Sequence, residues 1–252
     1  MPDMSQDGKT RRIGRERAIV LDVVRLARRV PSFPVERWFE LSDVACARQF
    51  AKPRISWVSL FARAYGIAGL AVPELRQAYV GGLIPRVYQS PYSVISVAVN
   101  RQTDLGDQLF FGRLRFPEQL SLVEIQQELE HYVNGDIKQA FRQQLQSSML
   151  PSLLRRLAWW WRLQIAVKKR ARRVGTGSIS VLASQGVYNA LHPSILTSSL
   201  SYGPQQADGR MWVTLQCDHR VMDGAAAARA INAIHDALRG QLLDELKQLH
   251  DT

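Results

Sequence analysis

The chain has 252 residues, of which 46% are apolar, and a formal net charge of +11. This length and apolar content allow one large domain with a substantial core and exclude a globally disordered chain. The positive charge favours an anionic partner, and two cysteines, Cys46 and Cys217, are too few for a disulfide framework or a zinc cluster, so no metal is expected.

The predicted elements mix helices and strands along the chain. Residues 1–15 are polar and basic, with no apolar stretch of a secretory signal, and no run of about 18 apolar residues follows them. We therefore expect a flexible basic leader and a cytoplasmic protein. Hydrophobic periodicity predicts helices at 18–30, 56–72, 121–133, 136–173, 224–240 and 241–249. Alternation and β-branched residues predict strands at 35–44, 92–100, 175–184 and 211–219, and two short strands within 73–89 around the turn at Gly81 and Gly82. Together they indicate an α/β domain over 16–252 with a mixed sheet.

Residues 217–224, CDHRVMDG, join the last predicted strand to a helix rich in alanine. The strand brings His219 to the edge of the sheet, where an imidazole can act as a general base near neutral pH. Asp223 stands at the helix start, where its carboxylate can accept backbone N–H groups. Gly224 permits a positive φ or a close backbone approach. These eight residues fit a helix cap with a packing histidine equally well.

The longer stretch DHRVMDGAAAARAINAI resembles the active-site signature of dihydrolipoyl acyltransferases, the core subunits of 2-oxo acid dehydrogenase complexes. Chloramphenicol acetyltransferases share its shorter H-x-x-x-D-G form. GTGSISVLASQG and YSVISVAVN resemble two further segments of the family. The resemblance implies a chloramphenicol-acetyltransferase-like α/β fold, with a mixed sheet covered by helices. It also implies a homotrimer with its active sites between subunits.

The resemblance also implies a role for each matched residue. His219 would deprotonate the acceptor, and Ser180 would stabilise the tetrahedral oxyanion, although Ser178 or Ser184 could take that place. Asp223 would hold the histidine loop by pairing with an N-terminal arginine, for which Arg17 is the first candidate and Arg15 the second. Gly224 would support the same loop. The remaining histidines (131, 192, 235 and 250) are interpreted as surface or packing residues.

Residues 136–173 have no counterpart in the family pattern and form a predicted helical insertion, basic and rich in tryptophan. From 149 to 173 it contains no acidic residue. Leu150, Leu154, Leu157, Trp161 and Ile165 form an apolar stripe at helical spacing, and the residues expected to make contacts are Trp159, Trp160, Trp161, Arg155, Arg156 and Arg162. Such a helix can lie on an anionic membrane, pack on its own domain, or form a basic rim that attracts an acyl donor. Nucleic acid is not expected, because no nucleic-acid-binding motif accompanies the charge.

The function implied is that of a stand-alone acyltransferase. It would move an acyl group from a CoA or carrier-protein thioester to a thiol, hydroxyl or amine, in a ternary complex and without a tightly bound cofactor. The leader has no room for the lipoyl domains of the classical family members. Two alternatives remain open: a lipoamide acyltransferase core that uses lipoyl domains on another chain, and a non-catalytic trimeric assembly subunit.

Overall fold

The structure, a computed structural model, describes residues 10, 13–104 and 106–250. Most of the predicted leader, residues 1–9, 11 and 12, lies outside the described residues. A 3₁₀ turn at Arg15–Arg17 leads into helix α1 (Ala18–Ala27). Within the described residues, no helix is both long and apolar enough to cross a membrane.

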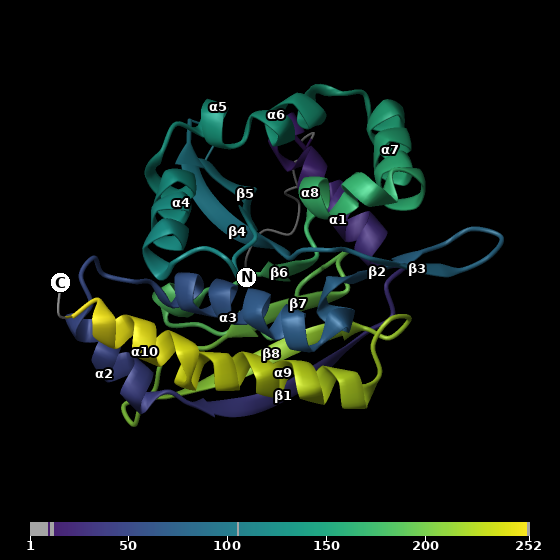
Figure 1. Cartoon of the computed structure of the whole chain (residues 1–252). Helices are drawn as coiled ribbons and strands as arrows, with labels where there is room; N and C mark the ends of the chain where they lie inside the picture. The colour runs from purple at the N-terminus through teal and green to yellow at the C-terminus, as the bar shows by residue number, and fades with distance from the viewer. Residues whose placement is uncertain (1–9, 11–12, 105, 251–252) are drawn as a thin grey trace, which may run out of the picture.

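A six-stranded mixed sheet runs through the molecule, in the order β1-β8-β7-β6-β4-β5. Its strands are β1 (Ser32–Glu40), β4 (Val94–Thr103), β5 (Gly106–Arg115), β6 (Gly177–Ile179), β7 (Ser198–Tyr202) and β8 (Arg210–Asp218). The central strands β4, β6 and β7 are parallel, and the remaining pairs are antiparallel. The predicted mixed sheet covered by helices is confirmed (Figure 1).

One face of the sheet is covered by five helices that enclose the main core. They are α2 (Ser42–Phe50), α3 (Trp57–Ala71), α4 (Leu122–Asn134), α9 (Gly224–Arg239) and α10 (Gln241–Gln248). The alanines of α9 let it pack closely on α3, and Ala227 and Ala230 are fully buried there. A 3₁₀ turn (Pro73–Arg76) leads from α3 into the hairpin of β2 (Gln77–Val80) and β3 (Arg86–Gln89), which extends away from the domain.

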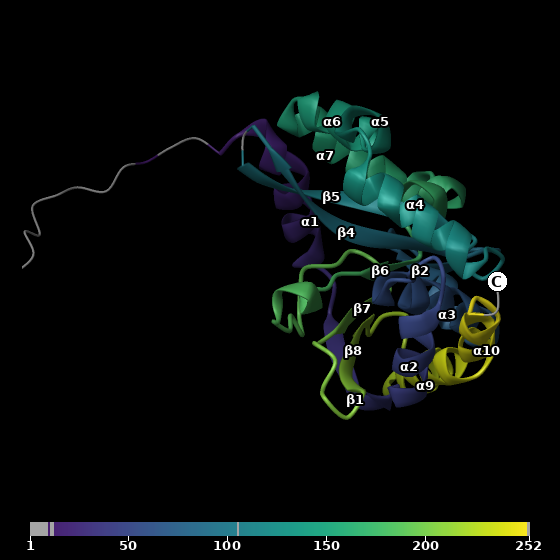
Figure 2. The ribbon, with the colours of Figure 1, turned by 90° about the vertical axis from the view of Figure 1, so that its left-hand side faces the viewer.

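The predicted insertion forms several short helical segments around the β4–β5 edge, rather than one long helix (Figure 2). They are α5 (Ile137–Ala140), α6 (Arg142–Met149), α7 (Ser152–Trp160), a π turn (Trp161–Ile165), a 3₁₀ turn (Val167–Lys169) and α8 (Arg170–Val174). Pro151 separates α6 from α7, because the residue before a proline is pushed out of helical geometry, and Leu150 is extended. Trp159, Leu163, Ile19, Ile195 and Leu196 form a second, smaller core on the other face of the sheet.

The free edge of β5 is covered by a side chain of the insertion. Gln144 of α6 accepts from the backbone N–H of Phe111 at 3.1 Å and donates to the carbonyl of Leu109 at 3.0 Å. These two bonds occupy backbone groups in the middle of the strand, so β5 cannot pair with another chain at that point.

Two predicted strands exist with other bounds than expected, and three elements, α2, β5 and β7, were not predicted. The strand predicted at 35–44 begins at Ser32 and ends at Glu40, and helix α2 follows because Val44 and Ala45 turn into the main core. The strand at 175–184 is short, since only 177–179 pair in the sheet. Strand β7 was not predicted, because its sequence SSLSY is mostly polar although every residue in it is buried.

Candidate functional site

The turn after β8 is fixed by an ion pair inside the D-H-R sequence. Arg220 donates to both carboxylate oxygens of Asp218, from Nε at 2.9 Å and from a terminal nitrogen at 2.7 Å. The backbone N–H of Arg220 also donates to Asp218 at 3.0 Å. Because this bidentate pair closes around the intervening residue, it sets the backbone at His219.

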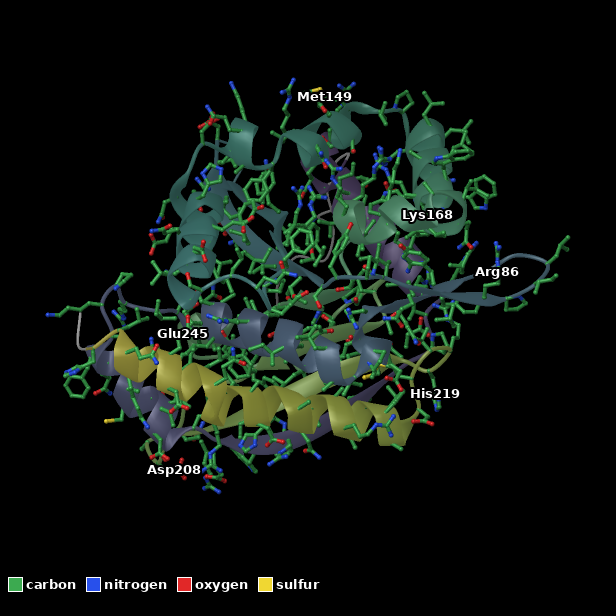
Figure 3. The ribbon with its side chains drawn as sticks, in the orientation of Figure 1. Arg86, Met149, Lys168, Asp208, His219 and Glu245 are labelled. Carbon is green, nitrogen blue, oxygen red and sulfur yellow. The ribbon has the colours of Figure 1, made fainter. Side chains whose placement is uncertain are left out.

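His219 itself is exposed at the edge of the sheet, as predicted. Its backbone N–H donates to the carbonyl of Pro31 at 2.9 Å, and its ring lies 4.7 Å from the Phe33 ring. Among the described residues, none forms a hydrogen bond with the His219 ring. Figure 3 shows His219 near the first turn of α9, open to solvent. The imidazole is therefore positioned by its backbone and by Phe33, with both nitrogens available to another molecule.

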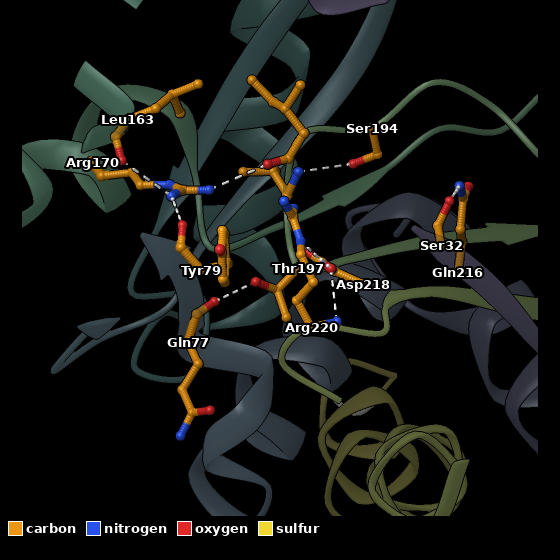
Figure 4. A network of polar contacts seen from close by, with 12 residues as sticks. Ser32, Gln77, Tyr79, Leu163, Arg170, Ser194, Thr197, Gln216, Asp218 and Arg220 are labelled. Atoms are coloured by element: carbon orange, nitrogen blue, oxygen red, sulfur yellow. Dashed lines mark hydrogen bonds and ion pairs between the residues drawn. The ribbon is translucent and has the colours of Figure 1, made fainter. Parts of the chain in front are cut away.

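A buried arginine connects this turn to the insertion (Figure 4). Arg220 stacks over the Tyr79 ring at 4.2 Å, and Arg170 of α8 donates to the Tyr79 carbonyl at 2.7 Å. Arg170 also donates to the carbonyls of Leu163 and Ile195. Burial, followed by the nearby Arg220 charge, lowers the pKa of Arg170 to about 10, so it stays charged at neutral pH. The histidine turn, the β2–β3 hairpin and the insertion are thus held by one network.

Asp223 caps helix α9, as expected, but the arginine predicted to support it lies elsewhere. The Asp223 carboxylate accepts from the backbone N–H of Ala226 at 2.8 Å. Arg17 precedes α1, which lies on the other face of the sheet from α9, and its 3₁₀ turn packs on β5 and α6. The predicted pairing of Arg17 with Asp223 is therefore not formed within this chain, and the same holds for Arg15 in that turn.

Gly224 does not have the special backbone expected of it. It is the first residue of α9, its φ is not in the left-handed region, and a Cβ there would meet nothing within 4 Å. Within one chain, an alanine would therefore fit at this position.

The sequence GTGSIS brings Ser180 to the face of the sheet opposite the main core. Gly175 has a φ of +115°, which an L side chain rarely adopts, and a Cβ on Gly177 would lie 2.2 Å from the Tyr65 hydroxyl oxygen. The Thr176 hydroxyl bridges the N–H and carbonyl of Val94 on β4. These requirements explain the two glycines and the threonine, and they fix the direction in which the following serines point.

Ser180 lines a cavity of about 510 Å³. The cavity lies between α1, strands β4 and β5, the insertion and residues 192–196. Among the described residues, none forms a hydrogen bond with the Ser180 hydroxyl, which is free to donate to a molecule in the cavity. Of the alternatives, Ser178 is tied to Ser199 at 2.6 Å, and Ser184 lies exposed in a 3₁₀ turn away from the cavity. Of the three serines, Ser180 is therefore in the best position to donate a hydrogen bond to a molecule in the cavity.

His192 lines the same cavity and was missed as a site residue. Its Nε2 lies 2.6 Å from the Ser199 hydroxyl, which lies 2.6 Å from the Ser178 hydroxyl. Burial lowers the pKa of His192, which favours the neutral ring. The only sequence pattern that marks it is His-Pro at 192–193, too common to indicate a site. His235 does pack as interpreted, 4.8 Å from the Phe39 ring in the core.

Ser180 and His219 of one chain are far apart. The Ser180 N–H donates to the carbonyl of Leu200 in β7, which pairs with Leu215 in β8, and His219 lies four residues beyond Leu215. With ~3.3 Å per residue and ~4.8 Å per strand spacing, their backbones are roughly 16 Å apart. A single chain therefore does not bring these two side chains together.

The six predicted contact residues of the insertion divide between its two sides. Arg155 and Trp159 turn inward, both 9% exposed, and Arg155 pairs with the buried Asp22 of α1. Neither lies on the outer surface of the insertion, and Trp159 instead lines the cavity. Arg162 lines the cavity. Trp160 and Trp161, each 52% exposed, and Arg156 remain on the outside.

Solved structures share the fold at low sequence identity. The truncated catalytic core of the 2-oxoacid dehydrogenase complex from Thermoplasma acidophilum matches 92% of this chain and 99% of its own, with a TM-score of 0.67 and 18% identity. Dihydrolipoamide acetyltransferase from Azotobacter vinelandii matches 95% of each chain (TM-score 0.66, 18% identity). A probable dihydrolipoamide acetyltransferase from Listeria monocytogenes matches 92% of this chain and 94% of its own, with a TM-score of 0.66 and 13% identity. No protein-family model and no curated protein sequence matches the chain. The fold implied by the D-H-R resemblance is confirmed.

Proposed function

We propose that this protein transfers an acyl group from a thioester of CoA or of a carrier protein to an acceptor bound in the cavity beside Ser180. The observation that carries this proposal is the free Ser180 hydroxyl in a cavity of about 510 Å³, in a chain that also presents His219 on a fixed turn. In the Azotobacter enzyme, a serine, a histidine and an asparagine were investigated for their roles in the catalytic mechanism. That histidine and asparagine are four positions apart, as are His219 and Asp223.

The proposed reaction uses each group once. His219 Nε2 accepts the proton of the acceptor thiol, hydroxyl or amine as that atom attacks the thioester carbonyl. Ser180 donates a hydrogen bond to the oxyanion that forms. Collapse of the tetrahedral intermediate expels the thiolate, which takes the proton back from His219. Asp223 caps the helix that follows the histidine turn and acts by position only.

The active site in this proposal lies between two subunits of a homotrimer. Since His219 and Ser180 are roughly 16 Å apart along one sheet, a hydroxyl and an imidazole that act on the same carbonyl must come from different chains. The exposed ring of His219, which has no hydrogen-bond partner among the described residues, is consistent with this arrangement.

The outer face of α7 is proposed to contact an anionic membrane surface. It exposes Leu153, Leu157, Trp160 and Trp161, with Arg156 and Lys168 near by. Tryptophans and cations beside an apolar strip are typical of interfacial helices. Residence at a membrane would bring the enzyme to an apolar substrate.

The test is thiol release from acyl-CoAs of increasing chain length, with dihydrolipoamide, alcohols and amines as acceptors. His219→Ala and Ser180→Ala should each lower kcat/KM by at least about 100-fold, the usual effect of removing a general base or an oxyanion donor. His131→Ala, on the exposed surface of α4, is the matched control and should leave turnover unchanged.

Three results would change the proposal. If His192→Gln abolishes turnover while His219→Ala retains it, the base is the cavity histidine and the site lies within one chain. If no CoA or carrier-protein thioester is turned over, the chain is a non-catalytic assembly subunit. Activity confined to dihydrolipoamide would instead identify a lipoamide acyltransferase that uses lipoyl domains on another chain.

A further inference from the structure

The cavity beside Ser180 has an apolar wall and a cationic side. Its apolar residues come from α1, β5, α7 and the loop before β7, and they include Val20, Val23, Phe111, Trp159 and Ile195. Its volume of about 510 Å³ falls within the range of ~300–1,000 Å³ typical of small-molecule sites. An apolar chain of moderate length fits such a wall, because burying it removes apolar surface from water.

Three arginines line the same cavity: Arg113 from β5, Arg162 from the π turn and Arg173 from α8. Among the described residues that line it, none is acidic, and none of the three arginines forms an ion pair with a described residue. Burial lowers the pKa of Arg113 and of Arg162, and in each case a neighbouring arginine lowers it further. Three cations that repel one another without a counter-charge lack the partner that a bound anion would supply.

Two of the three arginines, Arg113 and Arg162, are held in place by the protein. Arg113 donates to the Arg173 carbonyl and to Gln143, and the Arg162 guanidinium lies 5.8 Å from the centre of the Trp159 ring. Two further polar atoms that line the cavity, Trp159 Nε1 and His192 Nδ1, are buried and have no hydrogen-bond partner among the described residues. Guanidinium groups in fixed positions suit a carboxylate or phosphate, to which they can donate two parallel hydrogen bonds.

We propose that the cavity binds a single-chain amphiphile with one anionic group, a carboxylate or a phosphate, and that this molecule, through a separate hydroxyl, thiol or amine that attacks the thioester, is the acyl acceptor. Its chain lies along α1 and Phe111, and its anionic group is bound by Arg113, Arg162 and Arg173. The assignment as acceptor rests on the proposed acyl transfer. The assignment of ligand class rests only on the cavity. Because Arg162 and Arg173 belong to the insertion, the insertion determines substrate class.

Binding can be measured without any turnover. Calorimetric titrations would compare decyl phosphate and decanoate with decylammonium and decanol, all below the concentrations at which they form micelles. We expect the two anionic probes to bind at least tenfold more tightly than the neutral and cationic ones. The preference of decyl phosphate over decanoate, or the reverse, identifies the anionic group. Equal binding of decanol and the anionic probes would overturn the proposal.

Variants locate the site. The double variant Arg162→Gln/Arg173→Gln should weaken the binding of the anionic probes at least tenfold and leave the binding of decanol unchanged. Val20→Trp should weaken the binding of all four probes, because the larger side chain fills the cavity. Arg86→Gln, on the exposed hairpin, is the control for removing an arginine outside the cavity and should leave the binding of all four probes unchanged. Anion binding that is insensitive to both cavity variants would contradict the proposal. If the anionic probes bind as expected but the protein has no transferase activity, the ligand class is supported and the acyl transfer is rejected. If the protein is an active transferase but does not bind the anionic probes, the acyl transfer is supported and the ligand class is rejected.

Discussion

Asp22 and Arg155 are the residues that attach the insertion to the body of the domain. Asp22 on α1 is 2% exposed and pairs with Arg155 Nε on α7, and Arg155 also donates to the Leu150 carbonyl at 2.9 Å. Arg25 contributes a longer contact to Asp22 at 3.8 Å. Since α1 and α7 both line the cavity, this pair holds two of its walls together. An ion pair at this depth stabilises the fold only while both partners are present.

Removing one partner of the Asp22–Arg155 ion pair should therefore destabilise the fold more than replacing both. Asp22→Asn is expected to lower the free energy of unfolding by about 3 kcal/mol, because it leaves a buried guanidinium without its counter-charge. Asp22→Leu/Arg155→Met should recover most of that loss, since two apolar side chains can fill the same space. Urea denaturation followed by circular dichroism measures both. Arg156→Gln, the exposed neighbour, should change stability by no more than about 0.5 kcal/mol. If the stability losses of Asp22→Leu and Arg155→Met add up to the loss in the double variant, the pair is not coupled.

Helix α7 illustrates which part of an element its sequence can predict. The apolar stripe through Leu154, Leu157 and Trp161 exists as predicted, but it faces solvent. The inward side carries Trp159 and Arg155, which periodicity assigns to the flank and to the polar side. Tryptophans and leucines occur around the whole circumference, so spacing alone cannot select the buried face. That choice depends on Asp22, over 130 positions away, because it supplies the buried counter-charge for Arg155.

The exposed stripe of α7 is expected to bind anionic membranes. Vesicles of phosphatidylcholine and phosphatidylglycerol (3:1) should carry the protein upward in a flotation gradient, and pure phosphatidylcholine vesicles should carry less, because the cations of the insertion add electrostatic attraction. Trp160→Ser/Trp161→Ser should reduce the bound fraction at least tenfold. Phe50→Ser is the control, since Phe50 is also exposed but lies on α2, on the opposite face of the sheet. No flotation with either lipid, or no effect of the double variant, would reject this contact.

Across the whole molecule, the insertion covers only part of the sheet face opposite the main core. It lies over β4 and β5, while on the β1 side Glu36 and Trp38 remain exposed. An uncovered sheet face beside an exposed, positioned histidine is a suitable surface for a second copy of the chain. In the proposed trimer, such a copy would bring its His219 to the cavity of its neighbour.

Local sequence predicted the parts of the site that depend on local geometry. The Asp223 cap, the exposure of His219 and the position of Ser180 after two glycines all follow from a few neighbouring residues. The cavity could not be predicted, because its walls come from segments between residues 19 and 196 that meet only in the folded chain. For the same reason His192 was interpreted as a surface or packing residue, and the three arginines were not recognised as one cluster.

Mixed oligomers test the shared active site directly. Co-expression of His219→Ala and Ser180→Ala chains carrying different affinity tags, followed by purification through both tags, yields oligomers that contain both variants. In a cyclic trimer assembled at random from equal amounts, about one site in four would combine an intact His219 from one chain with an intact Ser180 from its neighbour. Each variant is inactive alone, so we expect the mixture, before selection through the two tags, to have activity near a quarter of the native value. If each site were built within one chain, every site would carry one substitution and mixing would restore nothing. Sedimentation of the native protein as a monomer would also remove the shared site.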